Sequence, residues 1–322
     1  MKNKVTSYLK VILFIVILGI MVYYVSVVLR DSGMQLIDVA DSIQWPLLAP
    51  ALLAYFMFYT FSSYAFLQLL NGGEGVIKIS ASTCFGITNI SGLTKYVPGK
   101  IWAYTIAYFV LKEHGIALTK YVFNSLVHII LFVVTPFLFM IPVLAFSFLL
   151  GMAAYFEWLL LMAGLTIYAL CLLFSPDILQ LFVSLINRFK KEAIEYCSVT
   201  RSDILKTQAW LFIAYFFYII SLVAITYSID AQHAFLDVLQ IAVVCSCSFI
   251  VGLTAVFVPG GFGIQEALIY ILVGAFNQNS LFVVILMIVF RLVSVSADIL
   301  VGLFSLWLIR NEVGTIVFKQ KS

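Results

Sequence analysis

Long runs of apolar residues decide what this chain can fold into. Six segments of about 20 residues or more carry few charges, enough for an α-helix to cross the ~30 Å hydrocarbon core of a bilayer. They lie at roughly 10–29, 46–70, 121–150, 154–175, 208–229 and 280–309. Only 10% of the 322 residues are charged, which is far below the share in soluble domains. We therefore predict an all-α polytopic membrane protein with about six full spans.

Two further apolar stretches, 79–112 and 236–276, are each interrupted by a Pro-Gly pair. The first break reads GLTKYVPGK and the second reads GLTAVFVPGG. Because proline disfavours continuation of a helix, each stretch predicts a moderate helix and a short one joined at a break, 79–97 with 101–112 and 236–258 with 262–276. The short helices are expected from Ile101 onward and from Phe262 onward. Because backbone polar groups cannot stay unpaired in lipid, we expect each pair to form a re-entrant hairpin that is buried in protein or lines a wet cavity.

The two breaks belong to an internal repeat. Placing Pro98 on Pro259 shifts the sequence by 161 residues and carries the span 46–70 onto 207–231. The same shift carries 121–150 onto the last span. Each half then reads long helix, broken hairpin, long helix, which is typical of transporter repeats.

This pattern predicts one transmembrane domain over residues 1–322. Repeat half one covers about 46–150 and half two about 208–310. A connecting span and a cytoplasmic amphipathic segment occupy 154–207.

The distribution of lysine and arginine predicts the orientation. If the N-terminus is cytoplasmic and each hairpin re-enters, the inside segments hold fourteen of the 18 cations and the outside segments hold only Arg30. This positive-inside bias predicts an integral protein of the bacterial or archaeal cytoplasmic membrane with both termini in the cytoplasm. It also makes the two halves an inverted repeat, with the first hairpin entering from inside and the second from outside.

The remaining three cations, Lys95, Lys100 and Arg291, fall at membrane depth. Lys95 and Lys100 flank Pro98 and Gly99, where the next short helix begins. The N-terminus of a helix favours an anion, and two lysines add positive charge. We interpret this break as half of a mid-membrane site for an anion such as a phosphate headgroup. The alternative is that the lysines reach an interface and the Pro-Gly pair only turns the chain.

The second break contributes Pro259, Gly260, Gly261 and Gly263, where glycine allows close backbone approach. Glu266 falls in the first turn of the following short helix. It either complements the helix dipole, pairs with a buried cation, or acts as a protonatable coupling group.

Three ionisable residues in the long spans complete the candidate site. Charges in spans are costly and normally face the bundle interior, so we predict that Arg291 pairs with Glu266. Asp298 lies seven residues further on, about 10 Å along the axis. His128, in the matching span of the first half, is interpreted as a helix–helix hydrogen-bonding residue rather than a proton relay.

The stretch PGGFGIQEA, residues 259–267, resembles the signature of the lysylphosphatidylglycerol synthase transmembrane (flippase-like) family. KYVPGKIW resembles the earlier Pro-Gly break in one branch of that family, and the resemblance covers about residues 10–310. It implies an inner-membrane lipid-handling module, fused in some members to a soluble aminoacyl-transferase domain. Only twelve residues follow Arg310, so a stand-alone member without synthase activity is expected. Such relatives are linked to cell-envelope glycolipid or polysaccharide pathways.

The sequence therefore favours a flippase-like transporter of an anionic lipid headgroup. Two alternatives remain: a non-catalytic partner of envelope-biosynthesis proteins, and an intramembrane lipid-modifying enzyme. No metal or cofactor motif is present in the sequence, and neither is a nucleotide-binding GxxxxGK[ST] motif. We expect membrane lipid as the partner and no nucleic acid.

Overall fold

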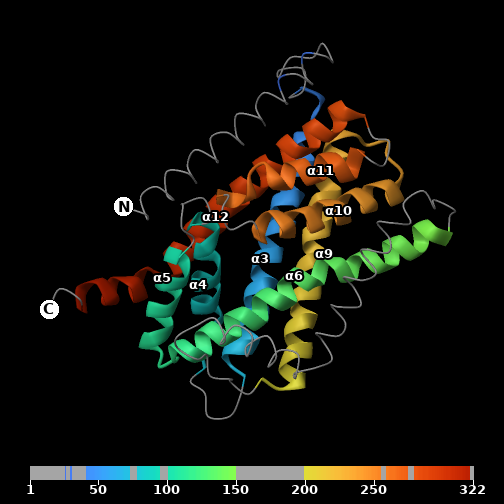
Figure 1. Cartoon of the computed structure of the whole chain (residues 1–322). Helices are drawn as coiled ribbons and strands as arrows, with labels where there is room; N and C mark the ends of the chain where they lie inside the picture. The colour runs from blue at the N-terminus through green and yellow to red at the C-terminus, as the bar shows by residue number, and fades with distance from the viewer. Residues whose placement is uncertain are drawn as a thin grey trace, which may run out of the picture. The chain divides into compact units, whose positions relative to one another are not determined.

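The computed structural model describes residues 26, 30, 41–72, 78–94, 101–149, 199–254, 259–274 and 279–319. This part of the chain is helical and contains no strand, which confirms the predicted all-α class (Figure 1). In order, the elements are η1 (Trp45–Leu47), α3 (Leu48–Leu70), α4 (Ala81–Thr94), α5 (Ile101–Glu113), α6 (Leu118–Leu149), α9 (Arg201–Ile229), α10 (Phe235–Thr254), η3 (Pro259–Gly261), α11 (Ile264–Gly274) and α12 (Ser280–Lys319).

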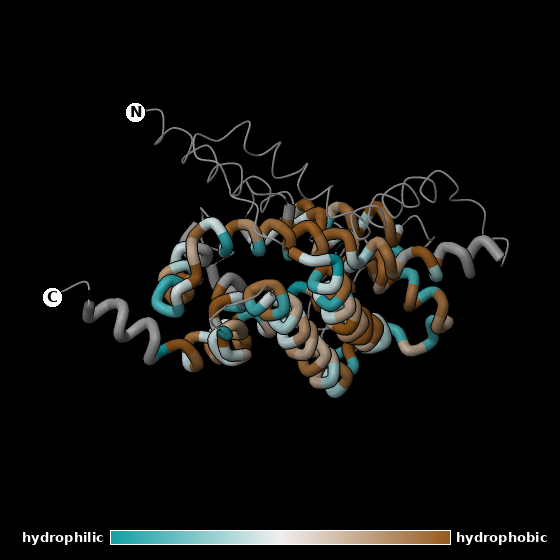
Figure 2. The backbone as a smooth tube through the Cα atoms, turned by 90° about the horizontal axis from the view of Figure 1, so that it is seen from below, coloured by the Kyte–Doolittle hydropathy of each residue, from teal (hydrophilic) through white to brown (hydrophobic). Residues whose placement is uncertain are grey.

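Five of these helices are long and apolar enough to cross a membrane. Their apolar stretches are Trp45–Leu70, Leu118–Val143, Arg201–Ile229, Phe235–Leu253 and Ser280–Arg310. Figure 2 shows hydrophobic residues predominating along the described helices. Four of the five match predicted full spans. The other two predicted spans, 10–29 and 154–175, lie outside the described residues, as does most of the amphipathic segment 176–207.

The fifth helix, α10, belongs to the stretch that we predicted as a re-entrant hairpin. Its apolar part has 19 residues, so by length alone it could span. However, 72% of that part is buried, against 28% for the apolar part of α3. A helix enclosed on most of its surface is a core element rather than one facing lipid.

The described elements repeat in one order, α3–α4–α5–α6 and then α9–α10–α11–α12. The 161-residue shift carries each helix of the first series onto residues that overlap its counterpart in the second. The described parts of α4 and α10 both reach the threonine of their GLT sequence, Thr94 and Thr254. The residues that follow, 95–100 and 255–258, lie outside the described residues.

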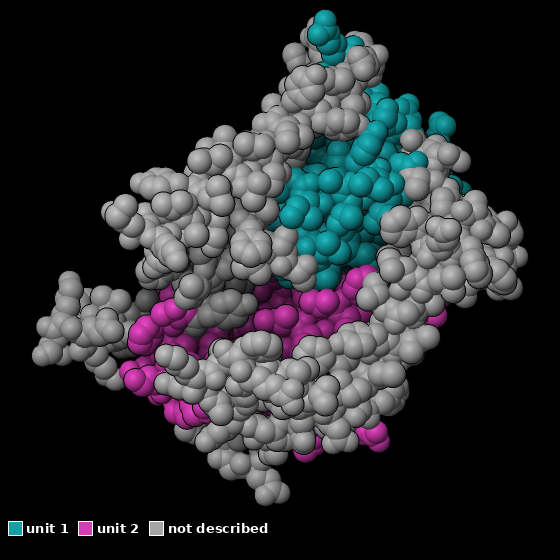
Figure 3. Space-filling model, viewed as in Figure 1, with its two compact units in different colours: residues 1–55, 95–100, 218–298 teal, residues 56–94, 101–217, 299–322 magenta. Residues whose placement is uncertain are grey.

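The chain forms two compact units, coloured in Figure 3. Unit 1 comprises residues 1–55, 95–100 and 218–298, and unit 2 comprises 56–94, 101–217 and 299–322. The boundaries fall inside α3, α9 and α12.

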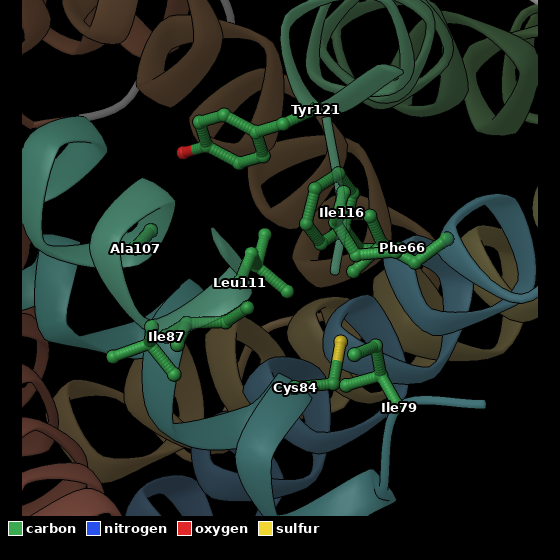
Figure 4. Close-up of a cluster of buried hydrophobic side chains, with 10 residues drawn as sticks. Phe66, Ile79, Cys84, Ile87, Ala107, Leu111, Ile116 and Tyr121 are labelled. Atoms are coloured by element: carbon green, nitrogen blue, oxygen red, sulfur yellow. The ribbon is translucent and has the colours of Figure 1, made fainter. Parts of the chain in front are cut away.

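In unit 2, helices α4 and α5 pack side by side as a hairpin (Figure 1). A buried hydrophobic cluster joins this hairpin to α3 and to the start of α6 (Figure 4). Phe66 comes from α3, Cys84 and Ile87 from α4, Leu111 from α5, and Tyr121 from α6. The short hairpin is therefore enclosed by protein, as irregular backbone at membrane depth requires.

In unit 1, helices α10 and α11 form the second hairpin, joined through η3. The ring of Tyr218 on α9 lies 5.3 Å from that of Tyr55 on α3 and 5.4 Å from that of Phe249 on α10. These aromatic contacts connect α9 to both α3 and α10. They do not involve the tip of the hairpin, residues 259–263, which is held by other interactions.

Candidate functional site

The tip of the second hairpin is built from glycines in a left-handed conformation. Gly260, Gly261 and Gly263 have φ values of 62°, 69° and 83°. A Cβ built on Gly261 would lie 2.6 Å from the carbonyl oxygen of Gly252 on α10. A side chain at position 261 is thus excluded twice, by backbone conformation and by contact with α10.

Arg291 on α12 organises this tip. Its Nε donates to Glu266 Oε1 at 2.6 Å, and its Nη2 donates to the same oxygen. Its Nη1 donates to the carbonyl oxygen of Gly260 at 3.2 Å, and its guanidinium lies 4.2 Å from the ring centre of Phe262. The ion pair that we predicted between Arg291 and Glu266 is confirmed. It is buried, with 13% of the Arg291 side chain and 6% of the Glu266 side chain exposed.

Glu266 also completes the N-terminus of α11. Since α11 begins at Ile264, Gly263 is the N-cap and Glu266 the third helical residue. Its Oε2 accepts a hydrogen bond from the backbone N–H of Gly263 at 2.7 Å. This is one half of a capping box. Two of the predicted roles of Glu266, helix-dipole complement and partner of a buried cation, are therefore performed by the same carboxylate.

This arrangement changes the electrostatics that we expected at the second break. The sequence suggested that the N-terminus of the second short helix would present positive charge to an external anion, and it left open whether the Arg291–Glu266 pair was structural or contacted the substrate. In the structure the Glu266 carboxylate already supplies that anion to both. Arg291 therefore adds no excess positive charge at the second break.

The first break lies outside the described residues. Lys95, Pro98, Gly99 and Lys100 all fall between the end of α4 at Thr94 and the start of α5 at Ile101. Ile101, where we predicted the helix start, is the first described residue after this break and belongs to α5. In the second half, α11 starts at Ile264, two residues later than the predicted Phe262. The left-handed glycines extend the break.

His128 and Asp298, the other two ionisable residues of the candidate site, lie on α6 and α12. In unit 2, the Nε2 atom of His128 lies 3.3 Å from the carbonyl oxygen of Ser62 on α3, and its ring contacts Phe66 and Phe132. This contact joins α6 to α3, as our interpretation of His128 as a helix–helix hydrogen-bonding residue requires. In unit 1, Asp298 is buried on α12, with 1% of its surface exposed.

Sequence reasoning overlooked Gln265, the residue before Glu266. It is 2% exposed, and its Nε2 is buried with no hydrogen-bond partner in the described part of the chain. A Cβ built on Gly252 would lie 2.9 Å from the Cβ of Gln265, so the absence of a side chain at Gly252 makes room for it. The feature that could have identified it is a glutamine next to Glu266 in a short helix whose other residues are apolar.

Within the described segments, no group of three His, Cys, Asp or Glu side chains is arranged to hold a metal ion. Of the five cysteines, Cys84, Cys245 and Cys247 are buried in helices and form no disulfide bond. Comparison of the chain with protein-family models, curated proteins and solved structures finds no match.

Proposed function

We propose that this protein binds the anionic headgroup of a membrane lipid and moves it between leaflets, as a flippase-like transporter. The proposal keeps the family relationship suggested by the PGGFGIQEA motif. Its main support is the buried Arg291–Glu266 pair, which holds a glycine-rich break inside a chain of apolar helices. Ionisable residues in such helices are costly, and they mark substrate or ion pathways.

The hairpin tip has the features that a headgroup site requires. Three left-handed glycines form the tip, and Gly260 and Gly263 are only partly buried, so a polar ligand can approach their backbone without meeting side chains of these residues. The repeated element order supplies a second broken hairpin with its own Pro-Gly pair. Paired broken helices near the midplane suit alternating access, because each half can gate one side.

The charges divide the roles between the two breaks. Arg291 is neutralised by Glu266, so it orders the tip and offers polar contacts without net charge. The sequence from position 75 to position 112, which includes Lys95 and Lys100, contains no acidic residue. We assign the attraction for the phosphate to these two lysines. The sequence contains no nucleotide-binding motif, so transport would be driven by an ion gradient or run downhill.

Native mass spectrometry of the purified protein in mild detergent tests the proposal. Wild type is compared with Lys100→Gln and with the control Lys78→Gln, which removes the same charge from an exposed position before α4. We expect wild type and Lys78→Gln to retain an anionic lipid that Lys100→Gln loses by about tenfold, the effect of one charge-assisted hydrogen bond.

Equal retention by all three proteins would contradict the headgroup site. It would favour the alternative of a non-catalytic partner in envelope glycolipid or polysaccharide synthesis. A lipid lost only from Lys100→Gln would justify the next step, a flipping assay in vesicles with a fluorescent analogue of that lipid.

A further inference from the structure

The amide of Gln208 on α9 is buried within unit 2 and only half satisfied. Gln208 is 4% exposed, and its Nε2 donates to Thr135 Oγ1 on α6 at 3.0 Å. The Thr135 hydroxyl donates in turn to the carbonyl oxygen of Leu131 at 2.7 Å. The Oε1 atom of Gln208 is enclosed and has no hydrogen-bond partner in the described part of the chain. Native proteins retain few such atoms because each is costly, so this oxygen requires a donor.

A second acceptor becomes available at the same turn of α6. Pro136 follows Thr135 directly and lies inside the helix. Because proline has no N–H, the carbonyl oxygen of Phe132 lacks the donor that residue 136 supplies in a regular helix. That carbonyl points toward position 136 and therefore emerges beside Thr135, to which Gln208 is bonded. Two acceptors, the Gln208 Oε1 atom and the Phe132 carbonyl oxygen, are thus found at one turn of α6.

The surroundings of this turn are apolar. Leu131 and Leu138, each within one turn of Thr135, belong to the buried hydrophobic cluster of unit 2. Leu211 on α9 belongs to the same cluster, and Pro136 is buried as well. An ion without a counter-charge is costly in such a place. A small neutral molecule with two O–H groups can instead donate to both acceptors, and buried water takes such positions in proteins.

We propose that a water molecule binds between α6 and α9 at Pro136, donating to Gln208 Oε1 and to the Phe132 carbonyl oxygen, and that α6 is hinged at this site. The water replaces the helix hydrogen bond that Pro136 removes. Helices bend at prolines and where water enters the hydrogen-bond ladder. The two parts of α6 can therefore turn about the site while the water keeps the freed carbonyl paired. This inference goes beyond the proposed function and does not depend on it.

The hinge belongs to the first half of the repeat. The 161-residue shift places Pro136 on Ala297 of α12, a helix that contains no proline. Beyond the hinge, α6 contacts α9 through apolar groups, since the ring centres of Phe139 and Phe212 are 5.1 Å apart. Apolar contacts are not directional, so they permit residues 137–149 to turn against α9.

The test locates the water by X-ray hydroxyl-radical labelling of the full chain in detergent. A water bound inside the protein forms radicals in place, and these oxidise the side chains beside it. We expect wild type to be oxidised at Leu131 and Phe132. Gln208→Met removes one acceptor and Pro136→Ala supplies the missing N–H, so both variants should lose this oxidation. The matched control is Pro142→Ala, at an exposed proline of the same helix, which should keep it.

Hydrogen–deuterium exchange of the same proteins tests the hinge. Pro136→Ala should slow exchange of the amides of residues 137–140 about tenfold, the effect of one helix hydrogen bond gained. Gln208→Met should not slow it, because the proline remains. Absence of oxidation at Leu131 and Phe132 in wild type, or equal oxidation in all four proteins, would overturn the water site. Exchange as fast in Pro136→Ala as in wild type would overturn the hinge. Neither result concerns lipid retention, so the proposed function is judged separately.

Discussion

At the scale of single residues, Arg291 does more than balance a charge. Its guanidinium contacts the carbonyl oxygen of Gly260, the ring of Phe262 and the carboxylate of Glu266. These contacts span the whole tip of the hairpin. A lysine has one ammonium group in place of this planar fork and could not make them together. The pair therefore fixes the conformation of the tip as well as its charge.

Breaking this pair from one side should destabilise the protein strongly. Glu266→Gln keeps an acceptor for the Gly263 N–H but leaves the guanidinium without a counter-charge, and Arg291→Gln leaves the carboxylate alone. Each is expected to cost about 3–5 kcal/mol of unfolding free energy. The double variant should cost clearly less than the two single costs combined, because neither charge is then buried unpaired. Unfolding equilibria in mixed detergent micelles measure all three.

The control for this cycle is Arg310→Gln. Arg310 is exposed at the end of the spanning part of α12, 5.4 Å from the ring centre of Trp307. Its loss should cost no more than about 1 kcal/mol, the value of an exposed cation–π contact. Additive costs for the Glu266 and Arg291 variants would show that the pair is not energetically coupled.

At the scale of helices and hairpins, the contact between α10 and α11 depends on two glycines that face each other. A Cβ on Gly261 would lie within 3.0 Å of three backbone atoms of Gly252. Backbone cannot move aside as the end of a flexible side chain can. The hairpin is therefore closed so tightly at its tip that neither position accepts a methyl group without a shift.

Gly261→Ala should consequently lose about 3 kcal/mol or more, from the left-handed φ and from overpacking together. The matched control is Gly274→Ala at the other end of α11, where a Cβ would meet no atom within 4 Å. It should be neutral or slightly stabilising, since alanine favours helix more than glycine does. Midpoints of thermal inactivation compare the two. A Gly261→Ala variant as stable as Gly274→Ala would mean that the tip is looser than the structure shows.

The sequence was informative about helix ends and poor at tertiary contacts. The GLT and Pro-Gly repeats predicted both breaks, because a proline followed by glycine removes a backbone donor and disfavours continuation of the helix. The Arg291–Glu266 pair followed from the cost of isolated charges in a span. The sequence could not show that Glu266 also caps α11, since this depends on the left-handed turn at Gly263. Nor could it show that Gln265 lacks a partner, because that requires knowing every neighbour.

Pro136 and Pro142 illustrate the limit of the same rule. Both lie inside α6, which continues through them from Leu118 to Leu149. Prolines are tolerated in membrane helices when neighbouring groups satisfy the freed backbone. Two prolines thus leave α6 unbroken, while Pro259 ends up at the start of η3, next to glycines that turn the chain.

At the scale of the whole molecule, the helix lengths set how the two hairpins can sit in a bilayer. Helices α4, α5 and α11 have 14, 13 and 11 residues, so at 1.5 Å per residue each reaches about 16–21 Å and none crosses ~30 Å of hydrocarbon. Helix α10, with 20 residues, reaches about 30 Å. Neither α4 nor α5 is therefore long enough to cross alone, whereas α10 is.

A re-entrant hairpin has both ends on the same side of the membrane, whereas a hairpin that crosses has its ends on opposite sides. Four exposed positions flank the two hairpins: Ala81 and Ala117 around α4–α5, and Ala231 and Ser280 around α10–α11. Each is changed to cysteine in a protein whose five native cysteines are replaced by alanine, and labelled with a membrane-impermeant maleimide in whole cells and in inverted vesicles. Because the positive-inside bias orients the halves oppositely, we expect positions 81 and 117 to react only in inverted vesicles, and 231 and 280 only in whole cells.

The result bears directly on how the molecule could transport a lipid. If positions 231 and 280 are labelled from the same side, α10 and α11 form a re-entrant hairpin. The 20-residue helix α10 is then a buried helix that does not cross the membrane, in agreement with its enclosure by protein. If they label from opposite sides, α10 crosses and the halves are not an inverted repeat. The two hairpins would then not enter from opposite faces, and alternating access by symmetric exchange of the halves would lose its structural basis.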